Sequence, residues 1–208
     1  MHLQKSKKEK IWRLIDILNW GEKYFKEKYF DNPRIEIEVL LQHIIGCKKI
    51  DLYLQFENTV TPENLIILRD LIKRRVNREP IQYIIGSSEF YGRKFFVNKD
   101  VFIPRPETEK LIDVSIDFLS KKENPIILDV GTGSGCIGIT IALEIPLSSV
   151  IAIDISNNAL SIAKKNADMY GLQNIQFINL DILSQDINPT SDMLISNPPY
   201  ISQEEIPG

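Results

Sequence analysis

The sequence has few of the residues from which metal sites and disulfide frameworks are built. Its 208 residues include two cysteines and two histidines. Cys47 and Cys136 are far apart and form no Cys-x-x-Cys pair, which argues against a disulfide framework and a zinc site. The sequence therefore predicts no metal centre, and its sparse thiols favour a cytoplasmic location in which they stay reduced.

Long hydrophobic runs are also lacking. Hydrophobic residues make up 43% of the chain, yet no stretch of them is long enough to cross a membrane as a helix. The N-terminal stretch MHLQKSKKEK is basic and lacks both the apolar segment and the cleavage site of a signal peptide. We therefore expect no association with a membrane.

A broad basic field is absent as well. The formal net charge is −3, whereas nucleic-acid binding usually needs a strongly positive surface, so no stable nucleic-acid binding is expected. The stretch LIKRRVNRE, residues 71–79, is a local exception. It is typical of the solvated end of a helix, where cations suit the dipole, and a docking surface is the less favoured alternative.

What the sequence does contain changes character along the chain. Residues 8–78 have the apolar spacing of helices. DNPRIEIEVLLQHIIG begins with cap-forming residues and ends at Gly46, a natural C-cap. TPENLIILRDLIKRRV begins with Thr61 as N-cap and Pro62 at the first helical position. The pattern predicts a small helical bundle, and no catalytic constellation falls within it.

The following segments predict strands. YIIGSSEFYGRKFFVNKDVFI is rich in aromatic and β-branched residues and predicts a β-hairpin. From residue 124 onward, PIILDV, VIAIDI, IQFINL and MLISN are apolar strands, and amphipathic helices separate the first three. Such alternation predicts a parallel sheet covered on both faces, with right-handed crossovers in a Rossmann-like core.

The expected fold class is therefore α/β. An incomplete Rossmann-like core of about four parallel strands follows a small α-helical bundle and a β-hairpin linker. We expect a helical substrate-recognition domain at 1–79, the hairpin linker at 80–104 and a cofactor-binding domain at 105–208.

A glycine-rich loop follows the first strand of the core. Its glycines let the backbone pass close to a ligand at a helix N-terminus. Asp154 ends the next strand about twenty residues later, where an acid can accept hydrogen bonds from ribose hydroxyls. Together they indicate a nucleoside-containing cofactor. The loop consists of Gly131, Thr132, Gly133, Ser134 and Gly135.

The identity of this cofactor stays open at this point. Gly133, Gly135 and Gly138 also match the dinucleotide fingerprint of a dehydrogenase. Asp129, however, precedes the loop, where its charge would repel a pyrophosphate and attract an amino group instead. Asp181 follows the third strand and suits either an adenine amino group or the cap of a short helix.

The stretch ISNPPY follows the fourth strand. Its two prolines fix two φ angles, and the residue before a proline is held extended. The turn therefore offers an amide side chain, carbonyl oxygens and an aromatic face, although turn chemistry alone explains the prolines. The tetrad is Asn197, Pro198, Pro199 and Tyr200.

The motifs DVGTGSGCIGI, AIDIS and ISNPPY, in this order and spacing, resemble class I S-adenosylmethionine-dependent methyltransferases. The NPPY tetrad narrows the resemblance to enzymes that methylate a planar nitrogen, in adenine of DNA or in a protein glutamine. The segment REPIQYIIGSSEFYGRKFFVNKDVFIPRPETEKLI, with the bundle before it, is similar to the HemK/PrmC family, which methylates the glutamine of the GGQ loop in peptide chain release factors.

This resemblance implies an enzyme, a protein-(glutamine-N5) methyltransferase with S-adenosyl-L-methionine as its cofactor and release factors as its protein partners. In PRPETE the polar residues beside the cofactor would be Arg105, Glu107 and Thr108. The catalytic residues would be those of the NPPY tetrad. The cofactor-binding residues would be Asp129, Gly131, Thr132, Gly133, Ser134, Gly135, Asp154, Asp181, Ile182 and Asn197.

The chemistry explains the tetrad. A carboxamide nitrogen is a poor nucleophile because its lone pair is delocalised into the carbonyl. The side-chain oxygen of Asn197 and the carbonyl of Pro198 can accept hydrogen bonds from the two N–H groups of the substrate amide. These bonds would aim the nitrogen at the methyl donor and stabilise the positive charge that develops on it. Tyr200 can pack against the flat amide.

The family continues beyond NPPY and completes a seven-stranded sheet, whereas this chain ends at ISQEEIPG. We therefore expect a domain truncated after its fourth strand. The alternatives are an adenine-N6 DNA methyltransferase, which would extrude its base into the pocket, and an inactive fragment that retains partner binding. A dehydrogenase is more distant.

Overall fold

The computed structural model describes residues 11–184 and 190–198. The chain divides into two compact units, with the boundary between Ile85 and Gly86. The domain limits expected at 79/80 and 104/105 stay a prediction. Within the described residues, no helix combines the length and the apolar character that crossing a membrane requires.

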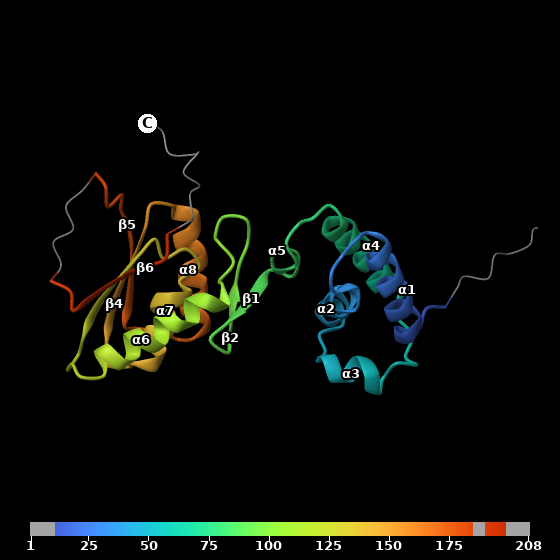
Figure 1. Cartoon of the computed structure of the whole chain (residues 1–208), viewed down its shortest axis with the longest axis horizontal. Coiled ribbons are helices and arrows are strands. Elements are labelled where there is room, and N and C mark those ends of the chain that lie inside the picture. The colour runs from blue at the N-terminus through green and yellow to red at the C-terminus, as the bar shows by residue number, and fades with distance from the viewer. Residues whose placement is uncertain (1–10, 185–189, 199–208) are drawn as a thin grey trace, which may run out of the picture. The chain divides into compact units, whose positions relative to one another are not determined.

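The first unit is helical, as the apolar spacing predicts (Figure 1). The caps predicted at Gly46 and Thr61 are confirmed, whereas Asn32 at the start of α2 makes no side-chain cap bond. Gly46 adopts a left-handed conformation, φ 72°, at the end of α2. Thr61 Oγ1 accepts a hydrogen bond from the backbone N–H of Asn64 at 3.3 Å at the start of α4. The helices are α1 (Leu14–Glu27), α2 (Pro33–Ile45), α3 (Lys49–Leu54), α4 (Pro62–Val76) and α5 (Ile81–Ile85).

Besides the apolar core of this bundle, two contacts join α2 to other helices. Gly21 of α1 lies against Ile37 of α2, and a Cβ at this glycine would overlap the isoleucine side chain. Arg75 of α4 donates two hydrogen bonds, at 2.7 and 2.8 Å, to the carboxylate of Glu36 in α2. Arg75 also lies over the ring of Phe30, so part of the basic stretch is packed rather than solvated.

The second unit begins with a hairpin that is shorter than predicted. Strands β1 (Ser87–Phe90) and β2 (Arg93–Phe96) pair antiparallel, whereas the preceding residues form helix α5. Gly86, at φ 71°, separates the helix from the hairpin. The sequence misled because the β-branched residues of α5 have strand propensity, and context overrides that preference.

A four-stranded parallel sheet forms the centre of the second unit, in the order β5-β4-β3-β6. Its strands coincide with the four predicted ones, and a short helix and α6 precede them. The elements are η1 (Pro106–Thr108), α6 (Glu109–Leu119), β3 (Ile126–Val130), α7 (Cys136–Glu144), β4 (Ser149–Asp154), α8 (Asn157–Met169), β5 (Ile175–Asn179) and β6 (Met193–Ser196).

In the described residues, the helices cover one face of this sheet. The core that contains Ile127, Val150 and Ile195 includes side chains of α6, α7 and α8. On the opposite face Leu128, Val130 and Ile153 form a small buried cluster, whereas Leu194, the partner of Leu128 in the outer strand β6, is 62% exposed. Successive right-handed crossovers in one direction place their helices on the same side, and the expectation that helices also cover the opposite face stays a prediction.

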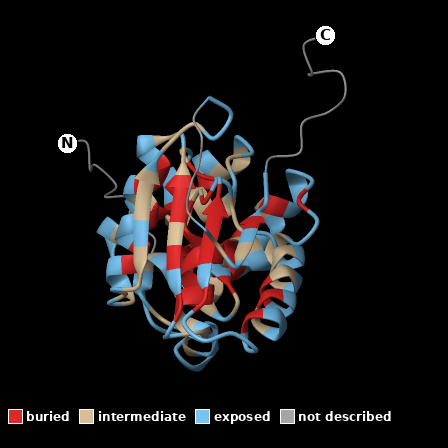
Figure 2. Cartoon of the chain, turned by 90° about the vertical axis from the view of Figure 1, so that its left-hand side faces the viewer, coloured by how far each residue is buried: buried red, intermediate tan, exposed pale blue. Residues whose placement is uncertain are grey.

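Burial follows this arrangement. Figure 2 shows the buried residues concentrated in the middle strands of the sheet. Strand β3 is buried at four of its five positions and β4 at three of its six, whereas the outer strands β5 and β6 consist mainly of intermediate and exposed residues. Because the strands are parallel, their carboxyl ends meet at one edge of the sheet, and the buried middle strands support this edge.

Asn166 of α8 joins the hairpin to the glycine-rich loop. It is fully buried, and its side chain accepts a hydrogen bond from the backbone N–H of Phe96 at 2.7 Å. Its amide group donates to the carbonyl of Phe96 at 3.1 Å and to the carbonyl of Ser134 at 2.8 Å. One side chain thus satisfies three backbone groups on two segments that are distant in sequence.

We expect Asn166→Ala to lower the free energy of unfolding of the second unit by about 2–3 kcal/mol, because buried backbone groups lose their partners. The exposed Asn158 on the same helix supplies the matched control, Asn158→Ala. Urea unfolding followed by circular dichroism reports both units. Fluorescence follows the first unit alone, since Trp12 and Trp20 are the two tryptophans of the chain. Equal effects of the two variants on the circular dichroism transition would contradict the prediction.

Candidate active site

A cavity of about 520 Å³ lies at the carboxyl ends of the strands, within the second unit. Residues after β3, β4, β5 and β6 contribute to its lining, and so does the segment before η1. This is the position in which open α/β sheets bind ligands, and the volume suits a small-molecule cofactor. The predicted site residues in the lining are Gly131, Gly133, Asp154, Asp181, Ile182 and Pro198.

The glycine-rich loop after β3 has a backbone that glycine alone adopts easily. Gly131, Gly133 and Gly135 have φ angles of 69°, 56° and 80°. At Gly135 a Cβ would also lie 2.7 Å from Ile139 and 3.1 Å from Ala163. The alternating glycines therefore let the chain turn tightly into α7 and leave the first two facing open space.

Asp154, at the end of β4, holds this loop in place. Its Oδ2 accepts a hydrogen bond from the backbone N–H of Gly133, and its Oδ1 accepts one from Ser156, each at 2.9 Å. A carboxylate offers about four lone-pair positions, so it retains capacity for further donors. Asp154 also lines the cavity, so the same side chain can orient the loop and contact a ligand.

Asp129 lies beneath the loop rather than in the described lining of the cavity. Its side chain is buried, and Oδ2 accepts hydrogen bonds from Thr132 Oγ1 at 2.6 Å and from the backbone N–H of Gly138 at 3.0 Å. Its Oδ1 has no partner among the described residues. Burial raises the pKa of the Asp129 carboxyl to about 6, which its two hydrogen bonds oppose and the nearby charge of Asp154 supports.

The contact with Asp129 explains why position 138 is a glycine. A Cβ at this position would lie 2.8 Å from Asp129 Oδ2 and 3.1 Å from Val150. The third glycine of the fingerprint therefore makes room for a carboxylate, and its presence requires no dinucleotide.

Asp181 and Ile182 follow β5 and line the cavity from that side. Asp181 Oδ1 accepts a hydrogen bond from the backbone N–H of Leu183 at 3.0 Å, which stabilises a turn. Asp181 therefore stabilises a local turn rather than a helix, and its contact with an adenine amino group stays a prediction.

Asn197 follows β6 directly, and a residue from PRPETE contacts it. The side-chain amide of Asn197 donates a hydrogen bond to Thr108 Oγ1 at 3.1 Å, although 89 residues separate the two in sequence. The neighbouring Ser196 donates from Oγ to the carbonyl of Val130 at 2.9 Å, which ties the end of β6 to β3. Pro198 lines the cavity, while Pro199 and Tyr200 lie outside the described residues.

The sequence analysis missed part of the lining. Phe102, which is 72% exposed, lies at the cavity together with Val101 and Asp100. A large aromatic residue two positions before PRPETE was the signal in the sequence that could have identified this part of the lining. Ile155 and Leu180 directly follow strands β4 and β5, so their positions also identify them. Among the described residues, no cluster of three or more histidine, cysteine or acidic side chains could hold a metal ion.

A parallel sheet in this order, with a glycine-rich loop after β3 and an acid at the end of β4, defines the Rossmann-like fold of class I methyltransferases. The sequence also matches two family models. Residues 16–86 match the PrmC N-terminal domain, and residues 109–207 match the methyltransferase small domain.

Relatives match over nearly the whole chain. The release factor glutamine methyltransferase of Chlorobaculum tepidum is 41% identical over 207 residues, which cover 95% of this chain and 70% of that protein. The enzyme of the same name from Rhodopirellula baltica is 38% identical and covers 93% of this chain and 68% of its own length. The chain therefore belongs to the release factor glutamine methyltransferase family.

A solved structure, the ribosomal protein L11 methylase of Lactobacillus delbrueckii subsp. bulgaricus, is 27% identical and covers 49% of this chain and 51% of its own, with a TM-score of 0.41. This overlap is partial, and the family assignment does not depend on it.

We expect the buried Asp129 to make stability depend on pH. Because its pKa is raised in the folded state, the folded protein binds the proton more tightly than the unfolded chain, and stability is lost as pH rises toward about 6. Relative to Asp129→Asn, the free energy of unfolding of the wild type should fall by roughly 2 kcal/mol between pH 4 and pH 7. Urea titrations of both proteins at several pH values measure this. A difference that stays constant or grows with pH would contradict the assignment.

Proposed function

We propose that this chain uses S-adenosyl-L-methionine to methylate the side-chain amide nitrogen of the glutamine in the GGQ loop of release factors. Family membership supports the reaction and the partner, because the matched relatives are named for them. The observation that carries the proposal is the position of Asn197, at the end of β6 and fixed by Thr108. The sparse, reduced thiols keep the cytoplasm as the expected location.

The residues around the cavity fit this cofactor. Gly131 and Gly133 offer an open backbone on which no Cβ intrudes, and Asp154 can accept hydrogen bonds from ribose hydroxyls. Asp181 and Ile182 would contact the base from the β5 side. Asp129 would act through the loop, because its carboxylate already holds Thr132 and the start of α7. When bound, the cofactor supplies a methyl group that its sulfonium already activates.

The orientation of Asn197 suits the recognition of a planar amide. Its own amide nitrogen is used in the bond to Thr108, which leaves the side-chain oxygen as the group to offer to a substrate N–H. A second acceptor is available in the carbonyl of Pro198, next to the cavity. Two acceptors would hold both substrate N–H bonds and stabilise the positive charge that develops on nitrogen. In this proposal Pro199 keeps the turn rigid and Tyr200 packs on the amide.

The test supplies methyl-labelled S-adenosylmethionine to the purified chain, with a release factor and adenine-containing DNA in parallel. We expect label on the release factor alone, and Asn197→Ala should lower the rate by about 10²-fold or more because an electrostatic contact is lost. Asn58→Ala, an exposed change in the first unit whose side chain bonds only to Gln55 among the described residues, should leave the rate unchanged. Label on DNA, or on neither substrate, would contradict the proposal for this chain.

Thr108 should act by positioning Asn197. Thr108→Val keeps the shape of the side chain but removes the acceptor, so we expect kcat to fall about tenfold while binding of the cofactor is unchanged. Thr108→Ser keeps a hydroxyl and should restore most of kcat. Steady-state kinetics and calorimetric titration with the cofactor measure the two effects. Equal activity of the valine and serine variants would contradict a positioning role.

A further inference from the structure

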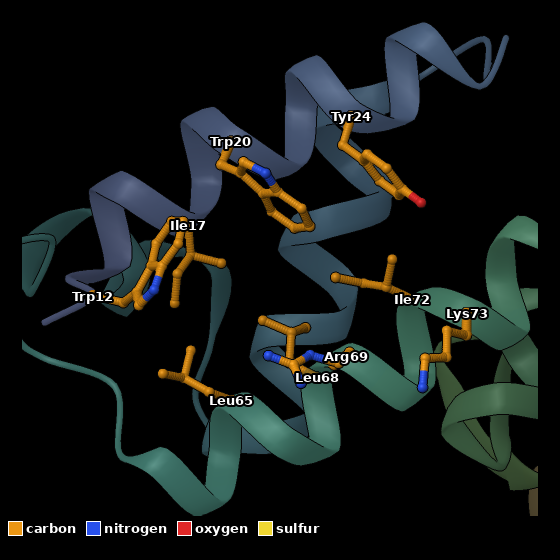
Figure 3. A pocket seen from close by; sticks show the side chains of 9 residues that line it. All are labelled: Trp12, Ile17, Trp20, Tyr24, Leu65, Leu68, Arg69, Ile72 and Lys73. Atoms are coloured by element: carbon orange, nitrogen blue, oxygen red, sulfur yellow. The ribbon is translucent and has the colours of Figure 1, made fainter. Parts of the chain in front are cut away.

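A second cavity, of about 340 Å³, lies in the first unit between α1 and α4. Figure 3 shows side chains of the two helices facing one another across this groove. Ile17, Leu68 and Ile72 are buried and form its apolar base. None of the described site residues of the second unit contributes to it, so the groove has no part in the proposed chemistry.

Aromatic rings form one wall of the groove. Trp20 stacks on Tyr24 with 5.1 Å between ring centroids, and Trp12 meets Trp20 edge-on at 6.2 Å. Trp20 is nonetheless 43% exposed. Large rings that are held rigid yet remain accessible lose little entropy when they bind a partner, and such residues dominate binding energy at interfaces.

Cations form the opposite rim. Arg69 and Lys73 are one turn apart on α4, and both are exposed. Within the described part of the chain, Arg69 has no ion pair, and Lys73 pairs with Asp70 of its own helix at 3.1 Å in an exposed contact. An exposed pair of this kind is weak, so the rim presents positive charge to an incoming partner.

The charge of the rim discriminates among occupants. The first ten residues of the chain, MHLQKSKKEK, carry four lysines and one glutamate, and are therefore repelled by this rim. A second copy that met this groove symmetrically would bring Arg69 and Lys73 against the same two cations. The groove instead suits a segment that inserts an apolar side chain between carboxylates.

We propose that the groove between α1 and α4 binds an acidic segment of the release factor that carries an apolar anchor. This inference rests on the proposed function for the identity of the partner. The apolar anchor enters between Trp20 and the base of the groove, and flanking carboxylates pair with Arg69 and Lys73. The contact holds the partner outside the methyl-transfer site, so it contributes affinity without taking part in the chemistry.

The two tryptophans of the chain, Trp12 and Trp20, both line the groove, which allows a direct test. The full chain is labelled with 5-fluorotryptophan, and its fluorine spectrum is recorded while an unlabelled release factor is added. We expect both resonances to shift. Arg69→Glu combined with Lys73→Glu should raise the dissociation constant about tenfold or more. The difference in dissociation constant between this variant and the wild type should become smaller as the salt concentration is raised.

A matched double variant controls for net charge. Lys26→Glu reverses an exposed cation on α1, and Lys121→Glu reverses a lysine that, like Lys73, pairs with an acid of its neighbouring turn. These changes should leave both the dissociation constant and the fluorine shifts as in the wild type. If the control weakens binding as much as the groove variant, the effect is one of overall charge and the proposal is wrong.

The remaining outcomes separate this proposal from the proposed function. A release factor that binds and shifts the resonances but receives no methyl group would overturn the reaction and leave the groove assignment standing. A release factor that is methylated without shifting either resonance would overturn the groove assignment alone. Shifts that depend on the concentration of the chain itself would assign the groove to a second copy, and the absence of any binding would also refute the proposal.

Discussion

The candidate site depends on the buried carboxylate of Asp129. It accepts hydrogen bonds from Thr132 in the glycine-rich loop and from the backbone of Gly138 in α7. A charged group in this position is costly to desolvate, which is why its pKa is raised to about 6. The two bonds offset part of that cost and fix the loop relative to the helix. Without these two bonds, glycine at every second position of the loop would allow its backbone many conformations.

A second carboxylate, that of Asp154, fixes the glycine-rich loop from the neighbouring strand. Asp154 binds the N–H of Gly133, so the loop is held from β4 as well as from β3. Asn166 then joins the far end of the loop to the hairpin through Ser134 and Phe96. The glycine-rich loop is thus held in place by the side chains of Asp129, Asp154 and Asn166. A preorganised loop of this kind lowers the cost of binding a ligand.

Much of this arrangement could be predicted from the sequence. The four strands, the caps at Gly46 and Thr61, and the glycine-rich loop follow from local rules, because periodicity and turn chemistry act over a few residues. The hairpin was predicted too long, because the β-branched residues of α5 fit a strand equally well. The burial of Asp129 beneath the loop was not predicted, since an acid before a glycine-rich turn is equally compatible with contact to a ligand.

The sequence by itself determined the order of the motifs, the four strands of the sheet with the helices between the first three, and the family to which the chain belongs. Only the tertiary structure decided the contact of Asn197 with Thr108, the three bonds of Asn166 and the aromatic groove between α1 and α4. Each of these joins segments that are distant in sequence. Local propensity carries no information about which distant side chains meet, because the packing of whole helices and strands selects the partner.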